Sequence, residues 1–269
     1  MLKHRVITAT ILLPLLIWGL YVLSPFNVAL AAGAITLAAA WEWTQLIPLN
    51  KWWQQAIFVA VVLAGLYFSS LLPIMVIINI GFVIWLWAFV VVFRYNMNLS
   101  ILGFEYPVVL TAAGFLILIS FWLSIVLLIA IPIIGNKLLL CCLLIVWGAD
   151  TGAYFAGRAW GKKPLASRVS PNKTWAGFWG GLALGSAVAV VSSYLLYLPF
   201  YHRFYIWGVS IVAILFSMGG DLMISVLKRQ AEVKDSGSIL PGHGGILDRL
   251  DSIAAAFVVF ALGAYLLLR

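Results

Sequence analysis

The sequence predicts an all-α polytopic membrane protein with about nine transmembrane helices and a cytoplasmic N-terminus. Of its 269 residues, 65% are hydrophobic and only 9% are charged, whereas a soluble domain carries roughly 25% charged residues. Apolar runs long enough to cross a hydrocarbon core of roughly 30 Å recur along the whole chain. The basic residues are concentrated in alternate connections between these runs.

The apolar runs define the expected helices. We place nine spans near residues 6–24, 27–47, 54–71, 73–93, 107–131, 138–157, 175–198, 204–226 and 252–268. The first run follows Lys3-His4-Arg5 and resembles a signal peptide. It exceeds the roughly 7–15 residues of a signal core, so we expect it to be retained as a membrane helix. The runs on either side of Pro73 could form a proline-kinked pair or two short spans.

The distribution of Lys and Arg tests this count of spans. With the N-terminus inside, 13 of the 16 basic residues fall in cytoplasmic connections, and only Lys137, Arg203 and Arg269 fall outside. Such an excess is typical of cytoplasmic loops, and one span more or fewer would remove it. The net charge of +8 therefore records topology and attraction to anionic lipid, and we expect no nucleic-acid partner.

The chain divides into two regions. Residues 1–106 have short connections and predict an N-terminal transmembrane scaffold of four spans. Residues 107–269 predict a C-terminal catalytic region of five spans, with charged cytoplasmic loops at 158–174 and 228–251. No internal repeat of the kind found in transporters is evident. The two adjacent cysteines, Cys141 and Cys142, lie in an apolar run and are expected to be packing residues.

Polar residues gather at the end of the eighth span. Asp221, Ser225 and Lys228 are spaced i, i+4 and i+7, so a continuing helix would present them on one face at the cytoplasmic edge. Arg229 lies on the flank of that face. A snorkelling Lys–Arg pair with one buried acid is the plainer alternative. Ionisable groups in a span are costly, however, which favours a functional role.

A second acidic pair, Asp248 and Asp251, precedes the ninth span. On a helix these carboxylates would be neighbours, and they would repel unless a cation lies between them or one takes a proton. Capping of the helix N-terminus would explain Asp248, but it explains the pair together with Asp221 less well. Three carboxylates beside basic residues predict a hard divalent cation, Mg²⁺, that holds phosphate oxygens.

Two polar connections complete the candidate site. The turn at 240–246, Leu-Pro-Gly-His-Gly-Gly-Ile, would let backbone N–H groups approach an anion. Its His243 could bind phosphate, transfer a proton or hold the turn. The loop 158–174 has five basic residues and no acid, so it either contacts anionic lipid or clamps phosphate. Asp150, just before this loop, is either a further site member or a satisfied buried acid.

A glycine run marks the seventh span. Its members, four residues apart, are Gly177, Gly181 and Gly185. This spacing predicts close helix packing, either within the chain or between subunits.

The segment from Ser225 to Asp251 reads Ser-x-Leu-Lys-Arg-x4-Lys-Asp-x-Gly-x2-Leu-Pro-x-His-Gly-Gly-Ile-x-Asp-Arg-Leu-Asp. This pattern closely resembles the phosphatidate cytidylyltransferase (CDP-diglyceride synthase) family. Residues 147–154 and 170–175 are also similar to stretches of that family, so the resemblance is strong over residues 145–255. The chain departs from the family pattern at two positions. Members commonly carry an acid or an amide where Ala176 stands, and an acid where Ile224 stands.

The resemblance implies transfer of CMP from CTP to phosphatidic acid, which yields CDP-diacylglycerol and pyrophosphate. It also implies a homodimer in the inner (plasma) membrane with a Mg²⁺-dependent cytoplasmic site, where a second monovalent or divalent ion could also bind. Carried over residue by residue, the resemblance assigns metal binding to Asp221, Asp248 and Asp251. It assigns the substrate phosphates to Lys173, Lys228, Arg229 and Lys234, with Asp150, Ser225 and His243 as further site members.

Charge dictates the expected mechanism, because both reactants are anions. Mg²⁺ would neutralise charge and align the attack of a phosphatidate oxygen on the α-phosphorus of CTP, while basic residues hold the leaving pyrophosphate. A secondary transporter or channel with membrane-edge carboxylates is one alternative, although the acids cluster at one edge. A CTP-dependent lipid-alcohol kinase and a non-catalytic membrane protein are the others.

Overall fold

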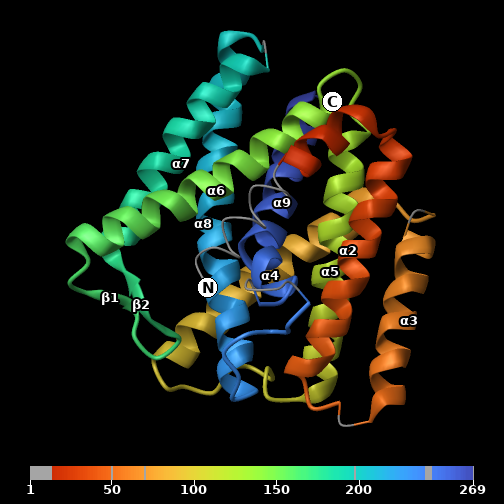
Figure 1. The fold of residues 1–269 in the computed structure, drawn as a ribbon, viewed down its shortest axis with the longest axis vertical. Helices are drawn as coiled ribbons and strands as arrows, with labels where there is room; N and C mark the ends of the chain where they lie inside the picture. The colour runs from red at the N-terminus through yellow and green to blue at the C-terminus, as the bar shows by residue number, and fades with distance from the viewer. Residues whose placement is uncertain (1–13, 50, 70, 197, 240–243, 269) are drawn as a thin grey trace.

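The structure, a computed structural model, describes residues 14–49, 51–69, 71–196, 198–239 and 244–268. Within these ranges, eight helices are long and apolar enough to cross a membrane. They are α2 (Pro25–Leu46), α3 (Trp52–Ser69), α4 (Ile74–Asn96), α5 (Pro107–Ile129), α6 (Gly135–Trp160), α7 (Trp175–Leu195), α8 (Phe200–Gln230) and α9 (Leu247–Leu268). The nearly all-helical architecture confirms the predicted polytopic membrane fold (Figure 1).

The helices lie where the apolar runs predict them. Of the first predicted span, residues 14–22 are helical, and its earlier part lies outside the described residues. The ambiguous pair around Pro73 is two separate helices, with Pro73 at the N-terminal cap of α4. Proline suits this position, because the backbone N–H of a residue at the N-terminal cap makes no hydrogen bond within the helix.

Three helices continue past their apolar runs, and this extension matters for the site. α6 runs to Trp160, α8 runs to Gln230 and α9 already begins at Leu247. The polar residues at these ends of the predicted spans, such as Lys228 and Asp248, therefore lie on helices rather than on loops.

The helices pack as a bundle around α5 and α9 (Figure 1). Phe121 of α5 and Phe257 of α9 meet edge to face, with ring centroids 5.9 Å apart. Cys141 and Cys142 are both buried and free, which confirms their predicted packing role.

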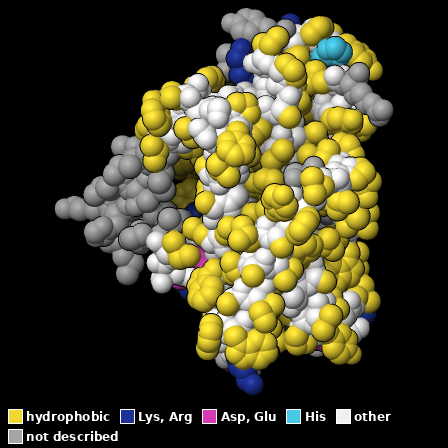
Figure 2. All heavy atoms as spheres, turned by 90° about the vertical axis from the view of Figure 1, so that its right-hand side faces the viewer, with side chains coloured by type: hydrophobic (Ala, Val, Ile, Leu, Met, Phe, Trp, Pro, Cys, Tyr) yellow, Lys and Arg dark blue, Asp and Glu magenta, His cyan; other side chains and the backbone are white. Residues whose placement is uncertain are grey.

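The outer surface of the bundle is apolar. Figure 2 shows a face covered largely by hydrophobic side chains, with Lys and Arg mainly at its two ends. Large exposed hydrophobic residues, such as Trp52 and Phe200, are common among the described residues. Lipid rather than water can solvate such a surface, as the membrane prediction requires.

The loop 158–174 contains a β-hairpin that the sequence did not predict. Strand β1 (Pro164–Ala166) pairs antiparallel with β2 (Ser170–Thr174), and the hairpin projects from the bundle beside α8 (Figure 1). Thr174 caps α7, because its hydroxyl accepts a hydrogen bond from the N–H of Gly177 at 3.1 Å. The hairpin thus passes directly into the next membrane helix.

The glycine run packs α7 against α6 within the chain. A Cβ atom at Gly177 would lie 2.9 Å from the carbonyl oxygen of Ala153, and one at Gly181 would lie 2.8 Å from that of Ala149. Real side chains do not tolerate such distances, so these glycines permit the close contact of the two helices.

Candidate active site

Two ion pairs mark the polar region of the bundle. Lys173 of strand β2 pairs with Asp221 of α8. Lys228, two turns further along α8, pairs with Asp248 of α9 at 2.7 Å. Because α8 is continuous from Asp221 to Lys228, the helix face predicted from the sequence exists, and its two ends bind different partners.

Three carboxylates gather around Lys173, and we call Asp150, Asp221 and Asp251 the acidic cluster. Asp251 interacts electrostatically with Asp221 and Lys173. Asp150, on α6, interacts with the same two residues and with Arg249. Gly220 explains part of this proximity, because its missing side chain lets α8 press against the Asp251 backbone.

Asp248 is bound by protein donors on both of its carboxylate oxygens. One of its oxygens accepts from Lys228, and the other accepts from the backbone N–H groups of Ser236 and Gly245 at 2.9 and 3.0 Å. The Asp248 carboxylate therefore ties the 228–251 loop to the ends of α8 and α9. Among the described residues, no three His, Cys, Asp or Glu side chains form a group that could hold a metal ion. Metal binding by Asp221, Asp248 and Asp251 stays a prediction.

Sequence reasoning missed one functional-site candidate, Glu42 of α2. This residue is fully buried and accepts hydrogen bonds from Ser236, Ile246 and Leu247. A carboxylate within a predicted span was the available signal, since such groups are costly in a membrane.

The remaining predicted residues surround these groups. Ser225 is buried on α8, between the two ion pairs. The Arg229 side chain donates to the carbonyl oxygen of Val169 at 3.3 Å, which joins the end of α8 to the hairpin. Lys234 is exposed in the loop after α8. His243 lies outside the described residues.

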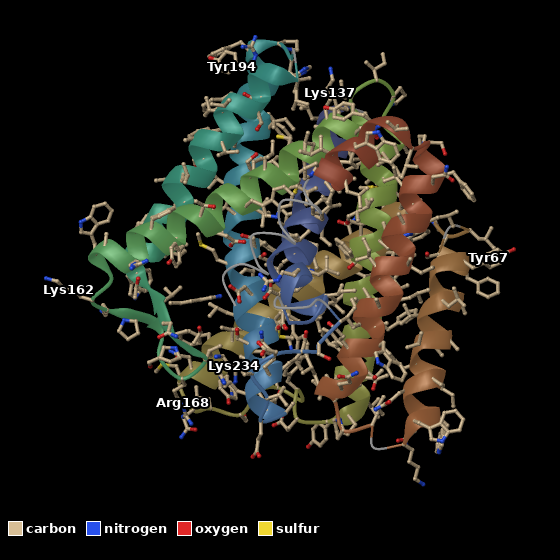
Figure 3. The ribbon with its side chains drawn as sticks, viewed as in Figure 1. Tyr67, Lys137, Lys162, Arg168, Tyr194 and Lys234 are labelled. Carbon is tan, nitrogen blue, oxygen red and sulfur yellow. The ribbon has the colours of Figure 1, made fainter. Side chains whose placement is uncertain are left out.

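Basic residues around the hairpin share one side of the molecule. Figure 3 shows Arg168 and Lys234 near the hairpin and the end of α8, and Lys162 where α6 meets the hairpin. Lys137 lies at the opposite end of α6. Anionic groups would therefore be attracted to the hairpin side of the polar region.

Asp221 and Asp251 offer oxygen donors of the kind that magnesium binds, and a magnesium ion at this site stays a prediction. Mg²⁺ prefers oxygen ligands and is usually bound by one or two carboxylates, with phosphate oxygens and water completing its coordination. Asp221 and Asp251 supply two carboxylates from adjacent helices, and the basic Lys173 beside them suits phosphate.

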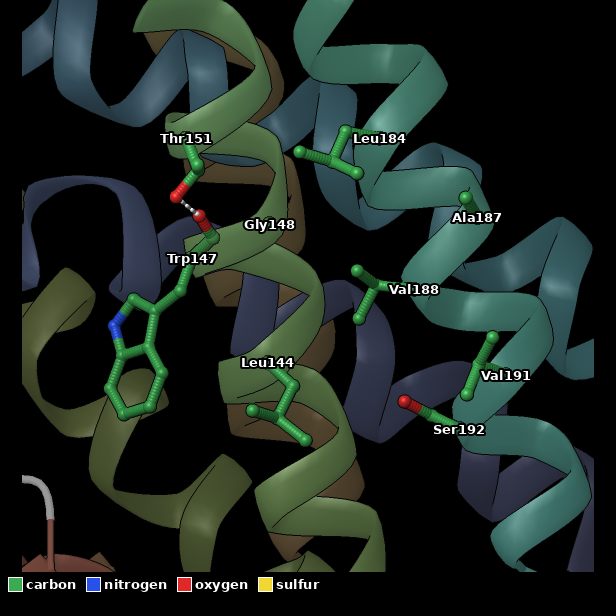
Figure 4. A pocket seen from close by; sticks show the side chains of 9 residues that line it. All are labelled: Leu144, Trp147, Gly148, Thr151, Leu184, Ala187, Val188, Val191 and Ser192. Atoms are coloured by element: carbon green, nitrogen blue, oxygen red, sulfur yellow. Dashed lines mark hydrogen bonds between the residues drawn. The ribbon is translucent and has the colours of Figure 1, made fainter. Parts of the chain in front are cut away.

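An apolar groove of about 520 Å³ lies between α6 and α7 (Figure 4). Its α6 side includes Thr151, the residue after Asp150. Its full lining is Leu144, Trp147, Gly148, Thr151, Leu184, Ala187, Val188, Val191 and Ser192. The lining contains no charged residue, so the groove is suited to an apolar occupant.

Comparison with known proteins places the chain in a family. The sequence model of the cytidylyltransferase family matches residues 3–267. The chain belongs to this family. Its membership confirms the resemblance found in the 225–251 segment and the expectation of a nucleotidyltransferase.

Curated members of the cytidylyltransferase family match the chain over nearly its whole length. It is 39% identical to a phosphatidate cytidylyltransferase of Pseudomonas aeruginosa over 264 residues, which cover 97% of this chain and 96% of the relative. It is 34% identical to the phosphatidate cytidylyltransferase of Haemophilus influenzae, with 97% and 98% covered. A Brucella suis protein of the same name is 36% identical, with 98% and 93% covered.

Proposed function

We propose that this chain is a phosphatidate cytidylyltransferase, which transfers CMP from CTP to phosphatidic acid and releases pyrophosphate. The names of its full-length relatives support this activity. The observation that carries the proposal is the polar site itself. Two Lys–Asp pairs and an acidic cluster meet on membrane helices, within the segments that resemble the family. A water-soluble nucleotide can meet a membrane lipid at such a site.

Basic residues would bind the phosphates. Lys173 and Lys228 stand at the two ends of the α8 face, so a triphosphate between them would contact both ammonium groups. Arg229 and the exposed Lys234 would extend this basic surface toward the leaving pyrophosphate. The attacking phosphate of the lipid is already an anion near neutral pH, so the transfer needs no general base.

Asp221 and Asp251 would hold Mg²⁺, with Asp150 beside them. When bound, the ion would supply charge neutralisation for the two anionic reactants. Lys173 pairs with Asp221 in the structure and would exchange this partner for a substrate phosphate.

The lipid would approach from the groove between α6 and α7. Its lining is almost entirely apolar, as acyl chains require, and α6 carries both this lining and Asp150. An acyl chain in the groove would leave the phosphate at the polar site, so no part of the lipid would have to leave the membrane.

We place the site on the cytoplasmic face of the inner (plasma) membrane. The distribution of basic residues supports this orientation, because 13 of the 16 lie in connections assigned to that side. CTP is also a cytoplasmic metabolite. The expected homodimer stays a prediction.

A direct assay tests the proposal. Purified protein in detergent, given labelled CTP, phosphatidic acid and Mg²⁺, should produce lipid-linked cytidine and pyrophosphate. Removal of Mg²⁺ by a chelator should stop the reaction, and adding the ion back should restore it. Absence of product with every divalent cation tested would refute the proposed activity.

A further inference from the structure

Glu42 connects the N-terminal region to the site across about two hundred residues of sequence. Its side chain is 0% exposed. One oxygen accepts from the N–H of Ile246 at 3.0 Å, and the other accepts from the N–H of Leu247 at 2.7 Å and the hydroxyl of Ser236 at 3.2 Å. Burial of a carboxylate is unfavourable unless donors of this kind satisfy its oxygens.

The loop packs directly on this carboxylate through two glycines. A Cβ atom at Gly237 would lie 2.5 Å from an oxygen of Glu42, and a Cβ atom at Gly245 would overlap both Glu42 and Ser236. Space explains the absence of a side chain at these two positions. The glycine-rich pattern that suggested an anion-binding turn therefore accommodates an anionic side chain of the protein itself.

The same loop also binds Asp248. The N–H groups of Ser236 and Gly245 donate to one Asp248 oxygen, and Lys228 binds the other. Residues 236–237 and 244–247, here called the anchored segment, thus lie between two carboxylates. Glu42 fixes the backbone that orients Asp248, and Asp248 orients the Lys228 ammonium.

We infer that Glu42 is a positioning residue, which holds the anchored segment and through it sets the place of Lys228 for a substrate phosphate. The role of Lys228 rests on the proposed function. The attachment of the anchored segment to Glu42 does not, so the two parts can be tested separately.

Glu42→Gln is the sharpest variant, because it keeps the side-chain size but replaces one acceptor oxygen with an NH₂ group. That group would face a backbone N–H or the Ser236 hydroxyl, and at least one hydrogen bond would be lost. Thr44→Val is the matched control. Thr44 is buried on the same helix, and its hydroxyl donates to the carbonyl oxygen of Trp41 in the preceding turn.

Two measurements on purified full-length protein test the inference. Hydrogen–deuterium exchange of peptides covering residues 244–248 should be about tenfold faster in Glu42→Gln, with no change in the hairpin 164–174. The KM for CTP should rise about tenfold, because Lys228 is displaced. A loss of folded enzyme would instead lower the apparent kcat and leave KM unchanged. Thr44→Val should match the wild type in both measurements.

A second variant approaches the same contact from the loop. Gly245→Ala should reproduce both effects, and it decides the test if Glu42→Gln cannot be purified in a folded state. Its control is Gly208→Ala on α8, where a Cβ atom would meet nothing within 4 Å.

Three results would overturn the inference. Unchanged exchange would show that Glu42 does not hold the anchored segment. Faster exchange with an unchanged KM would reduce Glu42 to a structural residue. A raised KM without faster exchange would place its effect outside the anchored segment. If the wild type makes no CDP-diacylglycerol, the proposed function fails, whereas the exchange measurement still tests the attachment.

Discussion

At the scale of single residues, the two Lys–Asp pairs differ in their surroundings. Lys173 and Asp221 keep 28% and 31% of their side chains exposed, whereas Lys228 and Asp248 keep 14% and 9%. The first pair can exchange its partners for substrate with little cost in desolvation. The second pair also has two backbone donors, so it holds the site together as well as presenting charge.

Asp248→Asn should abolish turnover. The amide would place an NH₂ group against either the Lys228 ammonium or the two backbone donors, so one contact becomes repulsive. Breaking such a buried pair costs about 3 kcal/mol of stability, which a shift in the thermal unfolding midpoint would report. The double variant Lys228→Met/Asp248→Asn should recover part of this stability but no turnover. Retained activity of Asp248→Asn would exclude Asp248 from the site.

Lys173→Gln should raise the KM for CTP by about tenfold, since a charge-assisted hydrogen bond to phosphate is lost. The protein should remain folded, because solvent reaches the Lys173–Asp221 pair and such pairs contribute little to stability. Steady-state kinetics at saturating phosphatidic acid measure the effect. Lys162→Gln, at the exposed start of the same connection, is the control and should leave KM unchanged. Equal effects of the two substitutions would instead indicate that the overall positive charge of this connection, and not Lys173 itself, attracts CTP.

At the scale of elements, the close pair of α6 and α7 serves two purposes. Their glycine-lined contact brings Asp150 and the Thr174 cap of α7 near the hairpin that carries Lys173. Further along, the apolar groove lies between the same two helices. One helix pair therefore places both a charged residue of the site and the surface proposed for the lipid.

Ala187→Phe should fill this groove and raise the KM for phosphatidic acid several-fold, without changing the KM for CTP. Ala112→Phe is the matched control, because Ala112 lines a groove of similar size, about 430 Å³, between α3 and α5. Detergent-solubilised assays over a range of lipid concentrations would measure the difference. Equal effects of the two substitutions would place the acyl chains elsewhere.

At the scale of the whole molecule, orientation in the membrane decides which compartment supplies the nucleotide. The extra positive charge of the assigned cytoplasmic connections favours one orientation. The hairpin and the loop after α8, which both carry predicted site residues, belong to the connections assigned to that side.

Single cysteines can test this orientation. In a variant with Cys141 and Cys142 replaced by alanine, Lys137→Cys should react with a membrane-impermeant maleimide on intact cells. Lys162→Cys should react only after permeabilisation or in inverted vesicles. Native protein should show little labelling, because both of its cysteines are buried. The reverse pattern would place the site on the outer face.

Local sequence chemistry alone determined the membrane class, the place of the helices and the family. Apolar length, charge asymmetry and the 225–251 pattern are properties of contiguous residues, so they can be read without a fold. The same reasoning identified Asp221, Lys228 and Asp248 as candidate site residues, because each lies at the end of an apolar run, and the family resemblance added Lys173.

Only the tertiary structure decided how these polar residues are paired. The packing of three helices brings Asp150 within electrostatic range of Asp221, and Asp221 within range of Asp251. Asp248 instead accepts hydrogen bonds from Lys228 and the loop backbone. Glu42 reaches the same loop from α2. Contacts of this kind depend on how helices distant in sequence pack, and neither periodicity nor residue spacing encodes that choice. Burial makes these contacts necessary, because in a membrane each carboxylate must find its hydrogen-bond donors within the protein.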